Sequence, residues 1–327
     1  MTDLAFADVL RLRALLESGQ VSAREVTADL VERIERLDPT LHSVIQLNPR
    51  AVDEAEAAQG GTGPLAGIPV LVKDNVDTAA PLRTTAGSLA LQDGFAVADA
   101  PLVRAIRDAG AVILGKTNLS EWANYRSSTS TSGWSAVGGL TANPHDLARS
   151  AGGSSSGSGA AVAAGLAPLA VGTETDGSIS CPASLNGVVG VKPTVGLVPR
   201  TGVVPIAFSQ DTAGPMARTV ADAALLLEVM ACADAADAMT ARDGRPSGVD
   251  YRLTARPGRL DGLRIGLPRK ALFGYHAGMD AVVQRAIDAL DELGAEVVDE
   301  VALPGLDSLG DAEYTVLDHE LKDGLFR

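Results

Sequence analysis

The sequence predicts an α/β fold, in which short buried strands alternate with amphipathic helices. Hydrophobic residues make up 46% of the 327 residues and glycine accounts for 35 of them, which is typical of a folded α/β protein and not of a disordered or fibrous one. Short apolar runs alternate with stretches in which apolar residues recur at helical spacing. Two Gly/Ser-rich turns, at residues 152–158 and 173–178, each lead into an apolar run.

The charge of the chain argues against nucleic acid as a partner. The formal net charge is −14, and a strongly acidic protein is repelled by a phosphate backbone. The chain contains no run of about eighteen apolar residues, so we expect no membrane partner. Composition does not predict the oligomeric state.

The N-terminal residues and the cysteines bear on the cellular compartment. Charged residues at Asp3, Asp8 and Arg11 interrupt what would be the apolar core of a secretory signal. Cys181 and Cys232 are too few for a disulfide framework and lack the spacing of metal ligands. We therefore expect a cytoplasmic enzyme without a metal site.

The first 60 residues read as a helical arm that packs on the core. A Ser-x-x-Glu capping box, Ser22 and Glu25, marks the start of the second helix. The elements expected here are helices at residues 4–18 and 23–37, a strand at 42–48 and a helix at 50–59.

The run IPVLV at residues 68–72 is expected to be a short buried strand that delivers Lys73 at its C-terminal end. Lysine is rarely buried unless it is paired, so the commoner role here is a solvated residue at the edge of the sheet. However, the C-terminal ends of strands in open α/β sheets are where sites assemble. A desolvated lysine at this place could act as a neutral base. Strand alternation sends the neighbouring Asp74 to the opposite face.

A helix at residues 100–110 and a strand at 111–118 are followed by a loop that carries Trp122, Tyr125 and Trp134. Because aromatic residues are only 3% of the chain, three of them so close together suggest the wall of a substrate pocket. A satellite cluster of the hydrophobic core explains them equally well.

The C-terminal part predicts a further βαβ unit after a polar surface excursion at residues 234–260. The elements expected are a helix at residues 219–231, a strand at 263–268, a helix at 280–294 and a strand at 296–304.

The two Gly/Ser turns favour acyl transfer over phosphate binding. Glycine lets backbone amides approach a ligand, and a helix that begins after such a turn points its first amides at that ligand. The turns lack the lysine of a phosphate loop and do not have the pattern of a dinucleotide loop. Amides beside serines can instead stabilise a tetrahedral oxyanion. None of the four histidines lies in either turn, and although the fold could bring one near, nothing in the sequence favours it; the alternative is an arrangement of serine and lysine.

Residues from about 63 to 231 resemble the amidase signature family. The motifs that carry the resemblance are GGSSSGSGAAVAAG, GTETDGSISCPAS and GVKPT, preceded by GIPVLVKDN and ILGKTNLSEWAN. The variants GTETDGS, SEWANYR, SGWS and SQDTAGPMARTVADA look most like the peptide amidase branch. The resemblance implies a mixed central β-sheet flanked by helices on both sides. Its core would comprise residues 61–233, with 234–327 continuing the domain but cut short relative to the family.

The resemblance also implies a catalytic set without metal or cofactor. The family's base falls on Lys73, its bridging serine in a cis peptide on Ser154, and its nucleophile on Ser178. Its oxyanion amides fall on Thr175, Asp176, Gly177 and Ser178. The chain departs from the family at Asp176, where glycine is common, at Ser180, where arginine is common, and at Ala151, where proline is frequent.

The implied reaction is hydrolysis of a linear carboxamide through a Ser178 acyl-enzyme, with Ser154 and Lys73 relaying the proton. Two alternatives stay open: the glutaminase subunit of a tRNA-dependent amidotransferase, and a truncated, inactive scaffold. Cys181, three residues after the proposed nucleophile, is expected at a helix start as a small buried structural residue.

Overall fold

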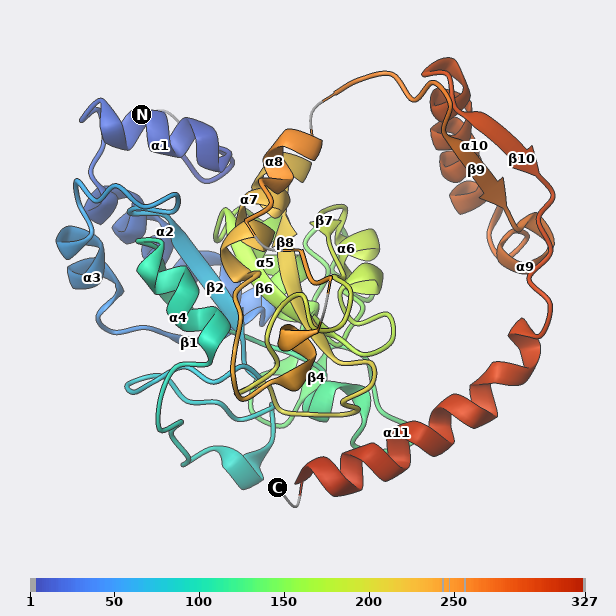
Figure 1. Ribbon diagram of the computed structural model, residues 1–327. Helices are drawn as coiled ribbons and strands as arrows, with labels where there is room; N and C mark the ends of the chain where they lie inside the picture. The colour runs from blue at the N-terminus through green and yellow to red at the C-terminus, as the bar shows by residue number, and fades with distance from the viewer. Residues whose placement is uncertain (1–3, 243, 247, 256, 326–327) are drawn as a thin grey trace. The chain divides into compact units, whose positions relative to one another are not determined.

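The computed structural model describes residues 4–242, 244–246, 248–255 and 257–325. The chain forms two compact units (Figure 1). One comprises the described residues of 1–255 and 320–327, and the other those of 256–319. The domain boundaries expected after residues 60 and 233 stay predictions.

A mixed six-stranded sheet forms the centre of the first unit, as the family resemblance predicts. Its order is β1-β3-β2-β6-β8-β7, in which β3, β2 and β6 run parallel to one another while β1, β8 and β7 are each antiparallel to a neighbour. The strands are β1 (Val44–Leu47), β2 (Pro69–Lys73), β3 (Val112–Thr117), β6 (Leu169–Glu174), β7 (Val189–Gly190) and β8 (Thr212–Ala217).

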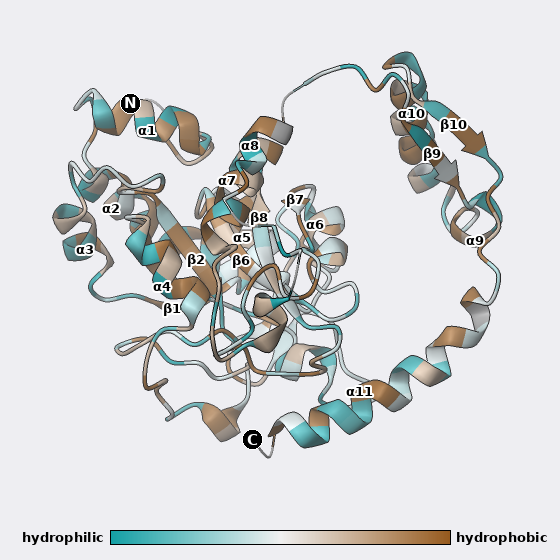
Figure 2. Ribbon diagram, viewed as in Figure 1, coloured by the Kyte–Doolittle hydropathy of each residue, from teal (hydrophilic) through white to brown (hydrophobic). Residues whose placement is uncertain are grey.

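Helices cover this sheet because its central strands present apolar residues on both faces. Every residue of β2, β3, β6 and β8 is buried, and Figure 2 shows the hydrophobic colour along β2. Helix α5 packs against β2, β3, β6 and β8, whereas α7 packs against β6, β7 and β8. The helices of this unit are α1 (Val9–Glu17), α2 (Ala23–Leu41), α3 (Ala51–Ala57), α4 (Pro101–Asp108), α5 (Ser156–Ala163), α6 (Ser180–Asn186), α7 (Val220–Met230) and α8 (Tyr251–Thr254).

The N-terminal helices confirm the predicted capping box but differ in their bounds. Ser22 accepts from the amide of Glu25, and the Glu25 carboxylate accepts from the amide of Ser22. The first helix begins at Val9, later than predicted, because the Asp8 side chain caps it by accepting from the amide of Arg11. The second helix runs past its predicted end at residue 37 and through Pro39.

The sequence pattern missed strand β8, whose residues TAGPMA contain two strand breakers. Gly214 is needed there because a Cβ at this position would lie 2.1 Å from the carbonyl oxygen of Val191. The short strands β4 (Trp134–Ser135) and β5 (Gly139–Leu140) and the 3-10 turns η1 (Leu89–Leu91), η2 (Glu121–Asn124) and η3 (Ala238–Ala241) were also not predicted.

The second unit confirms the predicted βαβ pattern. Strand β9 (Arg264–Leu267) pairs in parallel with β10 (Glu296–Asp299), and helix α10 (Ala277–Glu292) connects them. Helix α11 (Leu309–Leu325) includes most of the terminal segment LDHELKDGLFR, which resembles a helix of the family, and the elements not predicted in the C-terminal part are α9 (Arg269–Leu272) and η4 (Leu306–Ser308).

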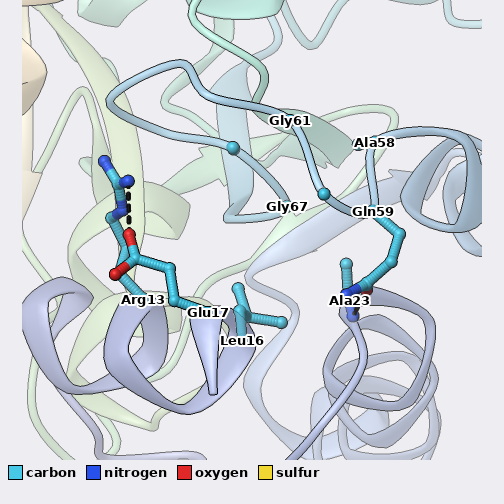
Figure 3. Close-up of a pocket in the computed structure, with 10 residues that line it drawn as sticks. Arg13, Leu16, Glu17, Ala23, Ala58, Gln59, Gly61 and Gly67 are labelled. Atoms are coloured by element: carbon cyan, nitrogen blue, oxygen red, sulfur yellow. Dashed lines mark hydrogen bonds and ion pairs between the residues drawn. The ribbon is translucent and has the colours of Figure 1, made fainter. Parts of the chain in front are cut away.

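A small hollow of about 40 Å³ lies between α1, the start of α2 and the segment 58–67 (Figure 3). Arg13 and Glu17 form an ion pair at its rim, with 2.7 Å between Nη2 and Oε1. No predicted site residue lines it. In the part of the chain that the structure describes, no helix has the length and apolarity needed to cross a membrane.

Candidate active site

The parallel neighbours β2 and β6 bring Lys73 and the second Gly/Ser turn to one edge of the sheet. Their register aligns Val72 with Val171, so both strands end on the same side. Lys73, the last residue of β2, is 0% exposed. The interpretation of Lys73 as a solvated edge residue is therefore wrong, because side chains from the two turns enclose its amine.

The Lys73 amine is surrounded by oxygen atoms from both turns. Its Nζ lies 2.7 Å from the Ser154 Oγ, 2.9 Å from the Ser155 Oγ and 2.8 Å from the Thr173 Oγ1. The carbonyl oxygen of Thr173 lies 3.3 Å away. These contacts satisfy three donors of an ammonium, or two donors and one lone pair of a neutral amine.

The three hydroxyls differ in whether their protons are committed to another acceptor. The Ser155 hydroxyl donates to the carbonyl oxygen of Thr173 at 3.1 Å, so it must accept from Lys73. The Thr173 Oγ1 already accepts from the Asn75 side-chain amide at 3.0 Å. In the described structure, the Ser154 hydroxyl has no partner other than Lys73. A neutral Lys73 can therefore accept a proton from Ser154 or from Thr173, whose hydroxyl keeps its proton when it accepts from Asn75.

Burial lowers the pKa of Lys73 well below its ordinary value. The negative charges of Glu174 and Asp211 oppose this effect and raise the pKa. Asp74 lies next in sequence, but its carboxylate accepts from the amide and hydroxyl of Thr85, consistent with the opposite face expected from strand alternation. The environment thus favours the neutral amine that a base requires.

The first turn places Ser154 by tight packing. The Gly153–Ser154 peptide bond is cis, as the family resemblance predicts. A Cβ on Gly153 would lie 2.3 Å from the Ser120 Oγ, so only glycine fits. The backbone amide of Ser155 donates to the carbonyl oxygen of Ser178 at 3.1 Å, which joins the two turns.

The second turn presents unpaired amides beside Ser178. Gly177 has φ +76°, a left-handed conformation that favours glycine. Among the described residues, the backbone amides of Asp176, Gly177 and Ser178 have no hydrogen-bond partner. Asp176 is exposed. The turn can therefore offer its amides to an oxyanion.

A buried carboxylate holds the far end of this turn. One oxygen of Glu174 accepts from the backbone amides of Ile179 at 2.6 Å and Ser180 at 2.8 Å. The Ser180 hydroxyl also donates to Glu174. Ser180 thus supplies a hydroxyl where the family commonly has arginine. Sequence reasoning missed Glu174, although it lies within the predicted turn at residues 173–178.

The proposed nucleophile, Ser178, is 6% exposed, and its hydroxyl has no hydrogen bond within the described structure. Cys181 lies at the start of α6, as predicted, but it is exposed. The prediction of a buried cysteine is wrong because Ser180 and Cys181 lie on the exposed side of this short helix, whereas Pro182 and Ala183 face inward. Among the described residues, no three His, Cys, Asp or Glu side chains are grouped as metal ligands.

The aromatic loop lies partly buried. Trp122 lies in η2, and Tyr125 follows it directly. Trp134 lies on β4, and the Arg126 guanidinium stacks 5.1 Å from its ring centre. These contacts do not distinguish a pocket wall from a satellite core cluster, so the pocket wall stays a prediction.

A second buried lysine, which sequence reasoning missed, lies on the neighbouring strand. Lys116 is 0% exposed and donates to the carbonyl oxygen of Val76 at 2.6 Å and to the hydroxyls of Thr78 and Thr84 at 3.0 and 3.2 Å. The Asp74 carboxylate lies 3.9 Å away. Burial lowers the pKa of Lys116 to about 8. A lysine within the apolar run ILGKT was the available signal.

Comparison with known proteins places this geometry in context. The Amidase family model matches residues 25–324. The structure is similar to the native peptide amidase from Stenotrophomonas maltophilia, with a TM-score of 0.93 and 50% identity over 99% of this chain and 67% of that one. It is also similar to a peptide amidase in complex with the competitive inhibitor chymostatin, with a TM-score of 0.92 and 49% identity over 98% of this chain and 67% of that one.

Among curated proteins, the chain is 43% identical to a subunit of the glutamyl-tRNA(Gln) amidotransferase of Acidothermus cellulolyticus. The match covers 100% of this chain and 64% of the relative. The chain thus spans just under two thirds of the length of that relative.

Proposed function

This chain belongs to the amidase signature family of hydrolases acting on C–N bonds, and from this premise we propose that it hydrolyses a linear carboxamide through an acyl-enzyme on Ser178. The observation that carries the proposal is the buried Lys73 amine 2.7 Å from the Ser154 hydroxyl, in a cis peptide beside the turn that holds Ser178. A buried amine with a lowered pKa, beside a serine hydroxyl that has no other partner in the described structure, suits a general base.

Acylation begins when neutral Lys73 takes the Ser154 hydroxyl proton as Ser154 takes the proton of Ser178. The Ser178 Oγ attacks the carbonyl carbon and the C=O electron pair moves to oxygen. The amides of residues 175–178 stabilise the resulting oxyanion. Because Ser178 donates no hydrogen bond in the described structure, a side-chain rotation that brings its Oγ to Ser154 must accompany substrate binding.

The same groups then pass the proton in the opposite direction and complete the hydrolysis. Protonated Lys73 returns its proton through Ser154 to the leaving nitrogen, the C–N bond breaks, and ammonia or an amine departs. Water then attacks the acyl-enzyme with Lys73 and Ser154 again removing a proton. The carboxylic acid is released and Ser178 regains its proton.

A peptide C-terminal amide is the substrate class that the similarities support best. The peptide amidase from Stenotrophomonas maltophilia shares 50% of its aligned residues with this chain. A relative that is 49% identical binds chymostatin as a competitive inhibitor. We propose a cytoplasmic location, because Cys181 and Cys232 are too few for the disulfide framework typical of secreted domains.

A glutaminase subunit of a tRNA-dependent amidotransferase is the second candidate, supported by 43% identity to one component of such an enzyme. The GTETDGS variant and the net charge of −14 favour the peptide amidase instead. A catalytically inactive scaffold is the third possibility that the experiment below can detect.

The test is ammonia release from a panel of C-terminal peptide amides and from glutamine, with Ser178→Ala as the matched control. We expect release from one or more peptide amides by the wild-type chain and none by Ser178→Ala. Glutamine hydrolysis that required tRNA together with a partner protein would favour the second candidate. Cooperative unfolding without an acyl-enzyme or ammonia release would identify an inactive scaffold.

A further inference from the structure

We propose that Asn124 recognises an N–H of the scissile carboxamide, which makes this residue the one that favours amides over esters. The inference rests on the proposed function and concerns a residue outside the lysine and serine relay. It depends on the backbone of η2, on an unpaired side-chain oxygen and on the position of both beside the cis Gly153–Ser154 bond.

The backbone around Asn124 is strained. Trp122, Ala123 and Asn124 have φ of 51°, 52° and 74°, so three consecutive non-glycine residues are left-handed. Single residues adopt this conformation at a cost, and runs of them are uncommon. Strained backbone clusters at functional sites, where the surrounding structure enforces it. Here the amide of Trp122 donates to the carbonyl oxygen of Ala86 at 2.9 Å, which anchors the start of the turn.

The Asn124 side chain carries a buried acceptor without a partner. Its Nδ2 donates to the Ser132 Oγ at 3.2 Å. Its Oδ1 is buried and, in the described part of the chain, accepts no hydrogen bond. An unpaired buried oxygen costs free energy, so a native structure that keeps one usually has a use for it. An N–H donor from a ligand would satisfy it.

The Asn124 side chain lies next to the catalytic turn. A Cβ on Gly153 would be 3.3 Å from the Ser132 Oγ, which is the atom that holds the Asn124 amide. The backbone amide of Ser120, just before this loop, donates to the carbonyl oxygen of Ser154 at 3.1 Å. The loop and the cis bond thus form one packed wall.

The proton transfer through Ser154 determines which part of the substrate faces this wall. Ser154 must protonate the leaving nitrogen, so the scissile nitrogen lies on the Ser154 side of Ser178. A primary carboxamide nitrogen carries two N–H groups, and an acceptor on that side would orient one of them. An ester has an oxygen without hydrogen at the same place and would leave the Asn124 Oδ1 unpaired.

The experiment compares Asn124→Gly with Ala123→Gly as the matched control. Glycine keeps the left-handed backbone at both positions, but only the first change removes a polar side chain. The substrates are N-acetyl-phenylalaninamide and N-acetyl-phenylalanine methyl ester, followed by ammonia and methanol release. Thermal unfolding of each variant establishes that it is folded.

We expect Asn124→Gly to lower kcat/KM for the amide about 10- to 100-fold while the ester rate stays within about threefold. Ala123→Gly should change neither rate. An equal fall for both substrates in folded Asn124→Gly protein, or no fall for the amide, would overturn the inference. If the wild type hydrolysed the ester but not the amide, the inference would also be overturned, while the proposed Ser178 acyl-enzyme would still stand. Hydrolysis of neither substrate by the wild type would refute the proposed function, and this inference with it.

Discussion

The second buried lysine, Lys116, makes the free energy of unfolding depend on pH in a way that Lys116→Met should abolish. Its Nζ is enclosed by the carbonyl oxygen of Val76 and the hydroxyls of Thr78 and Thr84. Burial outweighs the nearby charge of Asp74, so the native pKa is about 8 against an ordinary value of 10.5.

The sign follows from proton binding. Between pH 8 and 10.5 the unfolded chain keeps the Lys116 proton while the native chain has lost it. The unfolded state therefore binds more protons, and the free energy of unfolding rises with pH across this window. The full pKa difference is equivalent to about 3 kcal/mol, of which about 2 kcal/mol falls between pH 8 and pH 10.

The measurement is urea unfolding of wild type and Lys116→Met at pH 8 and pH 10. The difference in free energy of unfolding between the two proteins should change by about 2 kcal/mol over this range, in favour of the wild type. Lys73 titrates in both proteins, so its effect cancels in the comparison. Parallel pH dependence of the two proteins would show that the native Lys116 amine does not titrate in this window, and the reasoning would be wrong.

Four further outcomes test the site. Lys73→Ala should lower kcat/KM by several orders of magnitude and Lys73→Arg, permanently charged, should not restore it; near-full activity of folded Lys73→Arg protein would exclude the base. In the wild type, kcat/KM should rise with pH along one limb well below pH 10, because burial lowers the pKa of Lys73 and catalysis needs its neutral form. Glu174→Gln removes a charge that raises this pKa, so the limb should move to lower pH, and a move to higher pH would contradict the assigned electrostatics. Cys181→Ala should keep most of the activity, and a dead but folded variant, together with thiol-reagent inactivation of the wild type, would move the nucleophile to the thiol.

Local signals in the sequence predicted the elements that local interactions determine. The capping box of Ser22 and Glu25 fixed the start of α2, and the apolar run before Lys73 gave β2. The cis bond at Gly153–Ser154 was available only through the resemblance, since no spacing rule reveals it. The end of α2 was missed because a proline near a helix end usually stops it, whereas here the helix runs on until His42 adopts a left-handed cap.

The sequence analysis missed strand β8 and the role of Glu174 because each depends on residues that are distant in the sequence or brought together only by folding. Strand β8 survives a glycine and a proline because β6 pairs along its whole length. Glu174 can accept hydrogen bonds from the amides of Ile179 and Ser180 only after the chain beyond Ser178 has folded back towards it. Neither effect leaves a mark in hydrophobic periodicity, which reports only which face of an element is buried.

The two buried lysines show where such reasoning can be extended. A lysine at the end of or inside a buried strand is stabilised by oxygen atoms from turns, which reach Lys73 from residues 154, 155 and 173 and Lys116 from residues 76, 78 and 84. Both lysines stand in apolar runs whose neighbouring positions are buried, so a solvated amine would require the strand end to be open to water. Where the flanking turns are rich in serine and threonine, burial with hydroxyl partners is the better expectation. Applied to ILGKT and the Thr-rich segment after β2, this argument would have predicted a buried Lys116 without any relative. The two lysines differ in the hydroxyls that contact them. The Ser154 hydroxyl beside Lys73 has no other partner in the described structure, whereas the Thr78 and Thr84 hydroxyls beside Lys116 donate to the carbonyl oxygen of Val76.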